Sequence, residues 1–194
     1  MTRAPRTFKP TIEGIEACLA AGVQVRLNCV VEQQNFRHVP EHARTIVERF
    51  VKPFPSNPVR EVTYTFPSAY WSPEEWKRAL VPLDELRPFV LEAVHALTAA
   101  GVDVQATGTC GFPPCLLVEA PEAMRFLAPE SVSTLDGSGR RYGGACEPCV
   151  MKARCLGIRH EYLQVHGDRG VRPFDKEPAV KTVERLDGSR LEPM

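Results

Sequence analysis

Apolar residues recur with two different periods along the first half of this chain, and the two periods alternate. Segments with apolar residues three or four positions apart predict helices, and segments in which apolar and polar residues alternate predict strands. Helices are predicted over residues 11–21, 38–52 and 83–101, and strands over residues 23–31, 59–66 and 102–108. A further short helix is predicted to begin at Pro73, because proline suits the first turn and two glutamates follow it. Since helices separate consecutive strands, we expect a parallel sheet with right-handed crossovers.

Each of the three predicted strands is apolar on one side and polar on the other. A parallel sheet that lies between two layers of helices is apolar on both sides, so a polar side needs an explanation. It is either exposed in a two-layer fold, or it lines the lumen of a barrel that holds a polar ligand; we favour the barrel. The residues on the polar side are Gln24, Arg26, Asn28, Glu61, Thr63, Thr65, Gln105 and Thr107.

Three βα units are too few to close a barrel, which in its full form has eight. The predicted fold class is therefore α/β, with a partial parallel (βα) barrel of about three units over residues 1–109. On its polar side, Arg26 could contact a ligand carboxylate or pair with Glu61 on the next strand. We favour the ion pair between the strands.

Three closely spaced cysteines follow the last βα unit. Cys146, Cys149 and Cys155 are spaced C-x2-C-x5-C, and a tight turn followed by one helical turn would bring their sulfur atoms to one point. Thiolates are ligands of zinc and of iron–sulfur clusters, and either centre uses four protein ligands. The preferred fourth ligand is Cys115, with Cys110 as the alternative. Zinc is the second choice of metal, because zinc sites more often contain two CxxC pairs.

The composition narrows the class of protein. The chain has 24 basic and 24 acidic residues, so its net charge of zero gives no reason to expect nucleic acid or an anionic membrane as a partner. No apolar run approaches the about 20 residues of a membrane span, and the basic N-terminus lacks the apolar core of a signal peptide. With seven cysteines, an odd number, disulfides are not expected, and we expect a cytoplasmic protein.

The composition changes after residue 109. A small cysteine-rich region is predicted over residues 110–170, and within it the alternation in EYLQVHG predicts a short strand over residues 161–167. Residues 171–194 are charged and weakly periodic, which predicts an irregular tail without a partner.

Three stretches resemble the radical S-adenosylmethionine (SAM) enzyme family. TIEGIEACLAAGVQVRLNCVVEQQN, residues 11–35, is similar to the fifth βα segment of the family's barrel. GFPPCLL and CEPCVMKARCLGIRHEY resemble its auxiliary cluster region, known as SPASM or twitch, whose central motif is C-x2-C-x5-C. The family motif often continues with a further cysteine where this chain has Arg159, which favours the one-cluster, twitch-like form.

The resemblance implies an auxiliary [4Fe–4S] cluster, with zinc as the alternative. In this family a catalytic cluster reduces SAM to a 5′-deoxyadenosyl radical, which serves to oxidise or modify a substrate; a peptide is one candidate. The CxxxCxxC loop that binds the catalytic cluster is absent here, so this chain alone is not expected to start the reaction. The implied ligands of the auxiliary cluster are Cys115, Cys146, Cys149 and Cys155.

The resemblance also implies a partner, which is the N-terminal half of the barrel, either a missing part or the product of a split gene. SAM would bind only together with that half. Asn28, Asn35 and Thr65, near strand ends on the polar face, are the candidates to contact its ribose and adenine. The alternative function is a non-catalytic module, bound to zinc or to a cluster, that relays electrons or recognises a partner.

Overall fold

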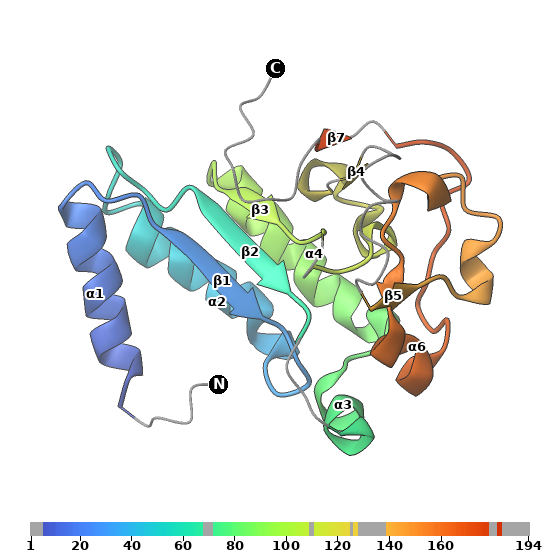
Figure 1. The fold of residues 1–194 in the computed structure, drawn as a ribbon. Coiled ribbons are helices and arrows are strands. Elements are labelled where there is room, and N and C mark those ends of the chain that lie inside the picture. The colour runs from blue at the N-terminus through green and yellow to red at the C-terminus, as the bar shows by residue number, and fades with distance from the viewer. Residues whose placement is uncertain are drawn as a thin grey trace.

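A parallel sheet of three strands forms the centre of the first half of the protein (Figure 1). The computed structural model describes residues 6–67, 72–108, 111–124, 126–127, 139–178 and 182–183. The strands are β1 (Arg26–Val30), β2 (Glu61–Thr65) and β3 (Asp103–Gln105), in the order β1-β2-β3. The predicted parallel pairing is confirmed, and the three strands form an open sheet rather than a closed barrel.

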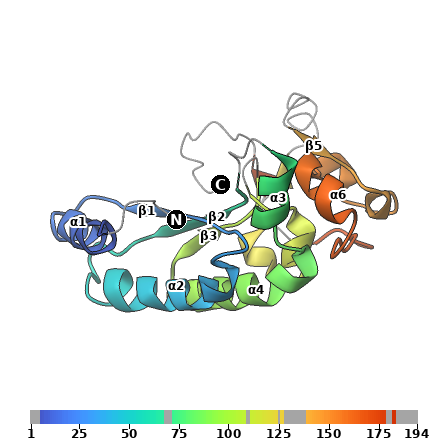
Figure 2. The same ribbon diagram turned by 90° about the horizontal axis from the view of Figure 1, so that it is seen from below.

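The predicted helices connect these strands. α1 (Phe8–Ala20) precedes β1, and α2 (Val39–Ile46) follows a 3-10 turn (Phe36–His38) and continues into a π-helical turn (Val47–Val51). α4 (Leu83–Ala99) precedes β3. Figure 2 shows α2 and α4 along one face of the sheet, with α1 beside the outer strand β1.

The short helix α3 (Pro73–Ala79) begins at the predicted proline. The Ser72 hydroxyl accepts a hydrogen bond from the Glu75 amide at 3.2 Å, and the Glu75 carboxylate accepts one from the Ser72 amide at 3.1 Å. This reciprocal capping box satisfies two amides that the helix itself cannot, which fixes where α3 starts.

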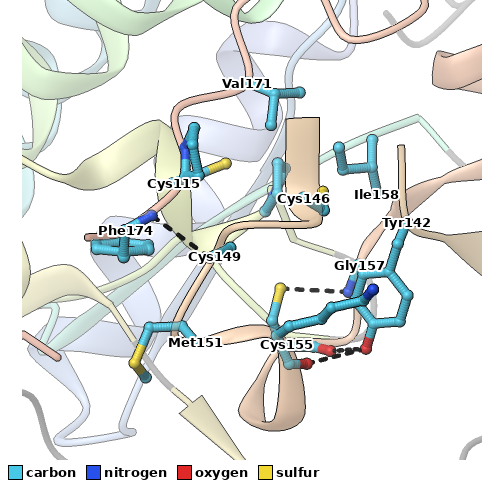
Figure 3. Close-up of a pocket in the computed structure, with 13 residues that line it drawn as sticks. Cys115, Tyr142, Cys146, Cys149, Met151, Cys155, Gly157, Ile158, Val171 and Phe174 are labelled. Carbon is cyan, nitrogen blue, oxygen red and sulfur yellow. Dashed lines mark hydrogen bonds between the residues drawn. The ribbon is translucent and has the colours of Figure 1, made fainter. Parts of the chain in front are cut away.

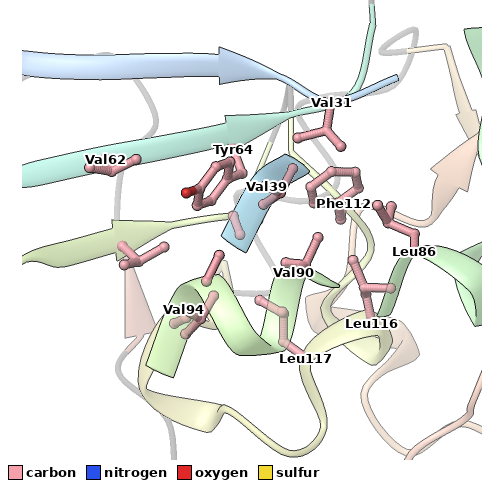
Figure 4. Close-up of a cluster of buried hydrophobic side chains, with 14 of the residues drawn as sticks. Val31, Val39, Val62, Tyr64, Leu86, Val90, Val94, Phe112, Leu116 and Leu117 are labelled. Atoms are coloured by element: carbon pink, nitrogen blue, oxygen red, sulfur yellow. The ribbon is translucent and has the colours of Figure 1, made fainter. Parts of the chain in front are cut away.

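The apolar side of the strands packs on the two covering helices (Figure 4). Val62 and Tyr64 of β2 are fully buried there, against Val39 of α2 and Val90 and Val94 of α4. The alternation in the sequence therefore identified the buried side of the central strand correctly. Burial of this face supplies the main hydrophobic stabilisation of the α/β part.

The opposite side of the sheet is polar, as predicted. Arg26 and Asn28 are exposed, Thr63 is half-buried and Thr65 is buried. The expected ion pair is present, with 3.7 Å between Arg26 Nη1 and Glu61 Oε1. The sheet is open, so this face lines no lumen: its part on β1 is exposed to solvent, and Thr65 at the end of β2 is covered.

The second half of the protein consists of short elements. β5 (Arg140–Arg141) pairs antiparallel with β6 (Ile158–Arg159), and β4 (Phe126–Leu127) pairs parallel with β7 (Thr182–Val183). Short 3-10 turns lie between them, at Pro114–Leu117, Pro121–Ala123, Gly144–Cys146 and Lys152–Arg154. Because β7 is a strand, the prediction of an entirely irregular C-terminal tail is wrong at these two residues.

The strand predicted over residues 161–167 is also wrong, since this segment is the helix α6 (His160–His166). Tyr162 and His166, one helical turn apart, pack ring to ring with centroids 5.1 Å apart. The buried Tyr162 hydroxyl accepts a hydrogen bond from the Leu83 amide at 2.9 Å. A helix places both rings on one face toward α4, which a strand with its period of two residues does not do.

Candidate metal centre

Four cysteines from two separate stretches of the chain line one pocket (Figure 3). The space measures about 380 Å³, part of it open to solvent, and most of the other lining side chains are apolar. The structure thus brings one cysteine of the GFPPC stretch to the three clustered ones. These residues are Cys115, Cys146, Cys149 and Cys155.

Tight turns position each of these side chains. Cys115 lies in the 3-10 turn that directly follows Pro113. Cys146 ends another 3-10 turn, and its carbonyl accepts the Cys149 amide at 3.1 Å, so the CxxC pair curves around the pocket. Cys155 directly follows a third turn, Lys152–Arg154. The Cys155 amide donates a hydrogen bond to the Lys152 carbonyl at 3.3 Å, which closes that turn. The segment from Cys146 to Cys155, with its C-x2-C-x5-C spacing, therefore folds as two successive turns.

Backbone amides donate hydrogen bonds to two of the four sulfur atoms. The Gly157 amide donates to Cys155 Sγ at 3.3 Å, and the Phe174 amide donates to Cys149 Sγ at 3.4 Å. Backbone amides near the other two sulfurs lower their pKa, against the effect of burial. Such donors stabilise negative charge on sulfur and are typical of thiolates bound to a metal or a cluster. These last two amides belong to Arg172, near Cys115, and Gly143, near Cys146.

The pocket nevertheless disfavours free thiolates. Burial raises the pKa of Cys115 to about 11 and that of Cys155 to about 12, and it also raises the pKa of Cys146. The negative charges of neighbouring thiolates raise these values further. Without a cation these three cysteines are therefore neutral thiols near pH 7, so they lack the electropositive surroundings of a reactive cysteine. Metal binding would displace their protons.

The donor set, four cysteine side chains, is one that zinc and [4Fe–4S] clusters both use. Within the described residues, no three Cys, His, Asp or Glu side chains are grouped closely enough to hold one metal ion. A tetrahedral zinc site needs sulfur atoms about 3.8 Å apart, given zinc–sulfur bonds of about 2.3 Å. In a [4Fe–4S] cluster each cysteine binds a different iron, so the four sulfurs stand farther apart around a larger centre. Cys110, the alternative fourth ligand, lies outside the described residues.

Two side chains support the turns that carry the cysteines. The Tyr142 hydroxyl lies 2.6 Å from the Cys155 carbonyl oxygen and 3.1 Å from that of Lys152. The buried guanidinium of Arg140 donates to the Gly157 carbonyl at 2.9 Å and to the Gly111 carbonyl at 2.6 Å. Arg140 thereby connects the turn after Cys155 with the stretch that leads to Cys115.

One wall of the pocket comes from residues that the sequence assigned to an irregular tail. Residues 171–178, which we call the strap, place Val171, Pro173 and Phe174 against the cysteines. The Phe174 carbonyl also accepts the Val150 amide at 3.0 Å. Ion pairs fix both ends of the strap, Arg172 with Glu119 and Arg154 with Glu177. These eight residues form no helix or strand, in agreement with the predicted irregular tail, but they pack against the pocket. The one local signal was the apolar pair Pro173-Phe174 among charged neighbours.

Of the residues predicted to contact a nucleoside, two lie on the sheet and Asn35 lies in the loop after β1. Asn28 is exposed in the middle of β1, and Thr65 is buried at the end of β2. The Asn35 side chain accepts a hydrogen bond from the Glu32 amide at 2.9 Å and donates one to the Val30 carbonyl at 2.8 Å. In this arrangement Asn35 shapes the loop after β1. A role in ligand binding stays a prediction for all three.

Comparison of the chain with family models, with curated proteins and with solved structures found no match in any of the three. The resemblance to radical SAM enzymes therefore depends on the quoted motifs alone. Among the described residues, no helix combines the length and the apolar character needed to cross a bilayer.

Proposed function

We propose that the four cysteines bind an auxiliary [4Fe–4S] cluster, and that the chain acts as the C-terminal part of a radical SAM enzyme. The main support is one observation: four cysteine side chains line a single, largely apolar pocket, in which two of the sulfur atoms accept hydrogen bonds from backbone amides. Four cysteine ligands are the number that a cubane cluster requires.

The chain's own residues would hold the cluster and exclude water from it. A bound cluster with four cysteine ligands supplies one-electron transfer and has no open coordination position. The amides directed at sulfur would stabilise its negative charge, and the apolar strap would limit solvent access, which together set the reduction potential. An electron relay or a structural role therefore suits this site better than direct binding of substrate.

The shape of the α/β part supports the second half of the proposal. Within the described residues β1 pairs only with β2, and no strand pairs with its other edge, beside which α1 lies (Figure 2). The polar face would become the lumen of a barrel if another chain or segment completed the sheet. The N-terminal half of a radical SAM barrel, with its CxxxCxxC loop, fits that position because it would add parallel βα units.

Anaerobic reconstitution tests the cluster. Protein incubated with ferrous iron and sulfide should become brown, absorb near about 400 nm and contain close to four iron atoms per chain. Changing any one of the four pocket cysteines to serine should strongly reduce the iron content. Cys18→Ser and Cys29→Ser are matched controls, because one lies on the exposed part of α1 and the other packs against the core. A colourless protein that binds one zinc through the same residues would favour the structural zinc module instead.

A separate measurement tests the enzymatic part of the proposal. The chain alone should form no 5′-deoxyadenosine from SAM and dithionite, even when its cluster is loaded. Addition of a companion chain with CxxxCxxC, sought in the neighbouring reading frames, should restore that product. If no such chain exists and no larger protein contains this segment, the electron-relay module is the better description.

A further inference from the structure

One buried arginine lies beside the pocket and has no function in the arrangement described so far. Arg87, on α4, is only 4% exposed. Its guanidinium donates hydrogen bonds to three backbone carbonyls, those of Leu116 at 3.2 Å, Cys115 at 3.3 Å and Gly170 at 2.8 Å. Arg87 therefore connects α4 with the turn that carries Cys115 and with the segment that leads into the strap.

The hydrogen-bond partners of Arg87 are all neutral. Among the described residues, the carboxylates nearest in sequence, Asp84 and Glu85, pair with Arg169, and Glu119 pairs with Arg172. Burial lowers the pKa of Arg87 most and the charge of Arg172 lowers it further, while the negative charges of Glu119, Cys115 and Asp84 raise it. A buried cation held only by carbonyls is costly unless a negative charge lies nearby.

Glu119 and Asp84 already pair with other arginines, and a further negative charge would arise in the pocket. Arg87 holds the carbonyl of Cys115, and its charge favours the thiolate form of that residue. Four thiolates around a [4Fe–4S]²⁺ core have a net charge of 2−, which becomes 3− after the gain of one electron. A fixed positive charge next to the centre stabilises the more negative, reduced state more than the oxidised state.

We propose that Arg87 is a positioning and charge-compensating residue of the four-cysteine centre, and that it raises the centre's reduction potential. The inference rests on the proposed function, because it requires an anionic cluster in the pocket. Arg87 acts through Cys115 and through its electric field, and it touches no substrate.

Redox titration of the reconstituted protein tests this role. Midpoint potentials are measured with dithionite as the one-electron donor in the wild-type chain and in Arg87→Gln, Arg87→Lys and Arg172→Gln. We expect Arg87→Gln to have a clearly more negative potential, and Arg87→Lys to stay near the wild-type value because the charge remains. Arg172→Gln is the matched control: it removes a charge on the strap beside the same pocket, but that charge is exposed and screened by solvent.

Thermal unfolding separates the electrostatic role from a purely structural one. Lysine cannot reproduce the three-carbonyl clamp, so Arg87→Lys should unfold at a lower temperature while its potential is retained. If Arg87→Gln does not fold, the midpoint potential of Arg87→Lys tests the inference by itself. A potential of Arg87→Lys more negative than that of Arg172→Gln overturns the inference.

The measurements distinguish failure of the proposed function from failure of the inference about Arg87. If the wild-type chain takes up no cluster, the proposed function fails and the inference fails with it. If the wild-type cluster forms, but its potential in Arg87→Gln equals that of the wild type or of Arg172→Gln, only the inference fails.

Discussion

Gly157 shows how closely the backbone approaches the cysteine pocket. Its amide donates to Cys155 Sγ, its φ is +84°, and a Cβ atom placed there would lie 2.6 Å from the Arg141 carbonyl oxygen. Gly157→Ala should therefore combine left-handed strain of about 1–2 kcal/mol with a backbone clash. Gly139→Ala is the matched control, because φ there is +70° but the space is open. Urea unfolding should show a clearly larger loss for Gly157→Ala; equal losses would contradict the clash.

His42 should make the α/β part less stable in acid. The ring lies 3.4 Å from the Tyr64 hydroxyl, and burial lowers its pKa below the ordinary value of 6.5. A lowered pKa means that the unfolded chain binds the proton more readily. The contribution of His42 is therefore complete above pH 6.5 and is lost as the pH falls toward the lowered value.

Unfolding in urea at pH 7.5 and pH 5.5 measures this effect. The wild-type chain should lose stability between these pH values, and His42→Gln should lose less because the titrating group is gone. His38→Gln, at an exposed position nearby, should behave like the wild type. The explanation is wrong if His42→Gln and the wild type lose the same amount.

At the scale of elements, the strap determines how well the pocket is protected. Phe174 is 7% exposed, lines the pocket, and its amide contacts Cys149. Phe174→Ala should cost about 3 kcal/mol of stability and admit water to the cysteines. In the reconstituted protein, the absorbance near about 400 nm should then decay faster in air. Val150→Ala, at a 53% exposed side chain next to the strap, should leave the decay rate almost unchanged.

The elements of the α/β part were predictable, because their apolar periods are long and their burial is one-sided. Val62 and Tyr64 show this directly: they alternate with threonines in the sequence and are buried in the structure. The sequence pattern predicts a strand where α6 forms, because a segment of seven residues can satisfy either the helical period or the strand period. Its contact with Leu83 at the start of α4, which decides between the two, is tertiary.

The candidate site likewise combines features with a local signal in the sequence and features that depend on tertiary contacts. The C-x2-C-x5-C spacing indicates a common centre locally, since consecutive turns bring the sulfurs together. Phe174 and Arg87 come to this site from distant parts of the chain. No local pattern marks Arg87, and the local signal for Phe174 is only its apolar pair with Pro173 among charged neighbours. Whether a backbone amide points at a sulfur atom depends on the path of the backbone. The type of residue that carries the amide does not reveal that path.

At the scale of the whole molecule, Tyr162 joins the cysteine-rich part to the α/β part. Its hydroxyl accepts from the Leu83 amide at 2.9 Å and donates to the Arg169 carbonyl at 2.6 Å, while Arg169 pairs with Asp84 and Glu85. Tyr162→Phe leaves a buried amide and a carbonyl without this partner, which should cost about 1–3 kcal/mol. Tyr142→Phe, whose hydroxyl lies nearer the surface, should cost less.

Two spectroscopic probes can follow this linkage. In the wild-type chain, near-ultraviolet circular dichroism and far-ultraviolet circular dichroism should report one common unfolding transition. In Tyr162→Phe the two curves should begin to separate, since the parts are less strongly joined. Coincident curves with an unchanged midpoint would show that Tyr162 does not couple the two parts.

The separation of Cys115 from the other three cysteines along the chain bears on how well the protein resists proteolysis in a cell. If an inorganic centre joins them, it closes a long loop and removes many conformations from the unfolded chain, as a covalent cross-link does. The loaded form would then resist proteolysis, and the unloaded form would be the one that proteases degrade. The abundance of this protein would rise and fall with the supply of iron and with exposure to oxygen.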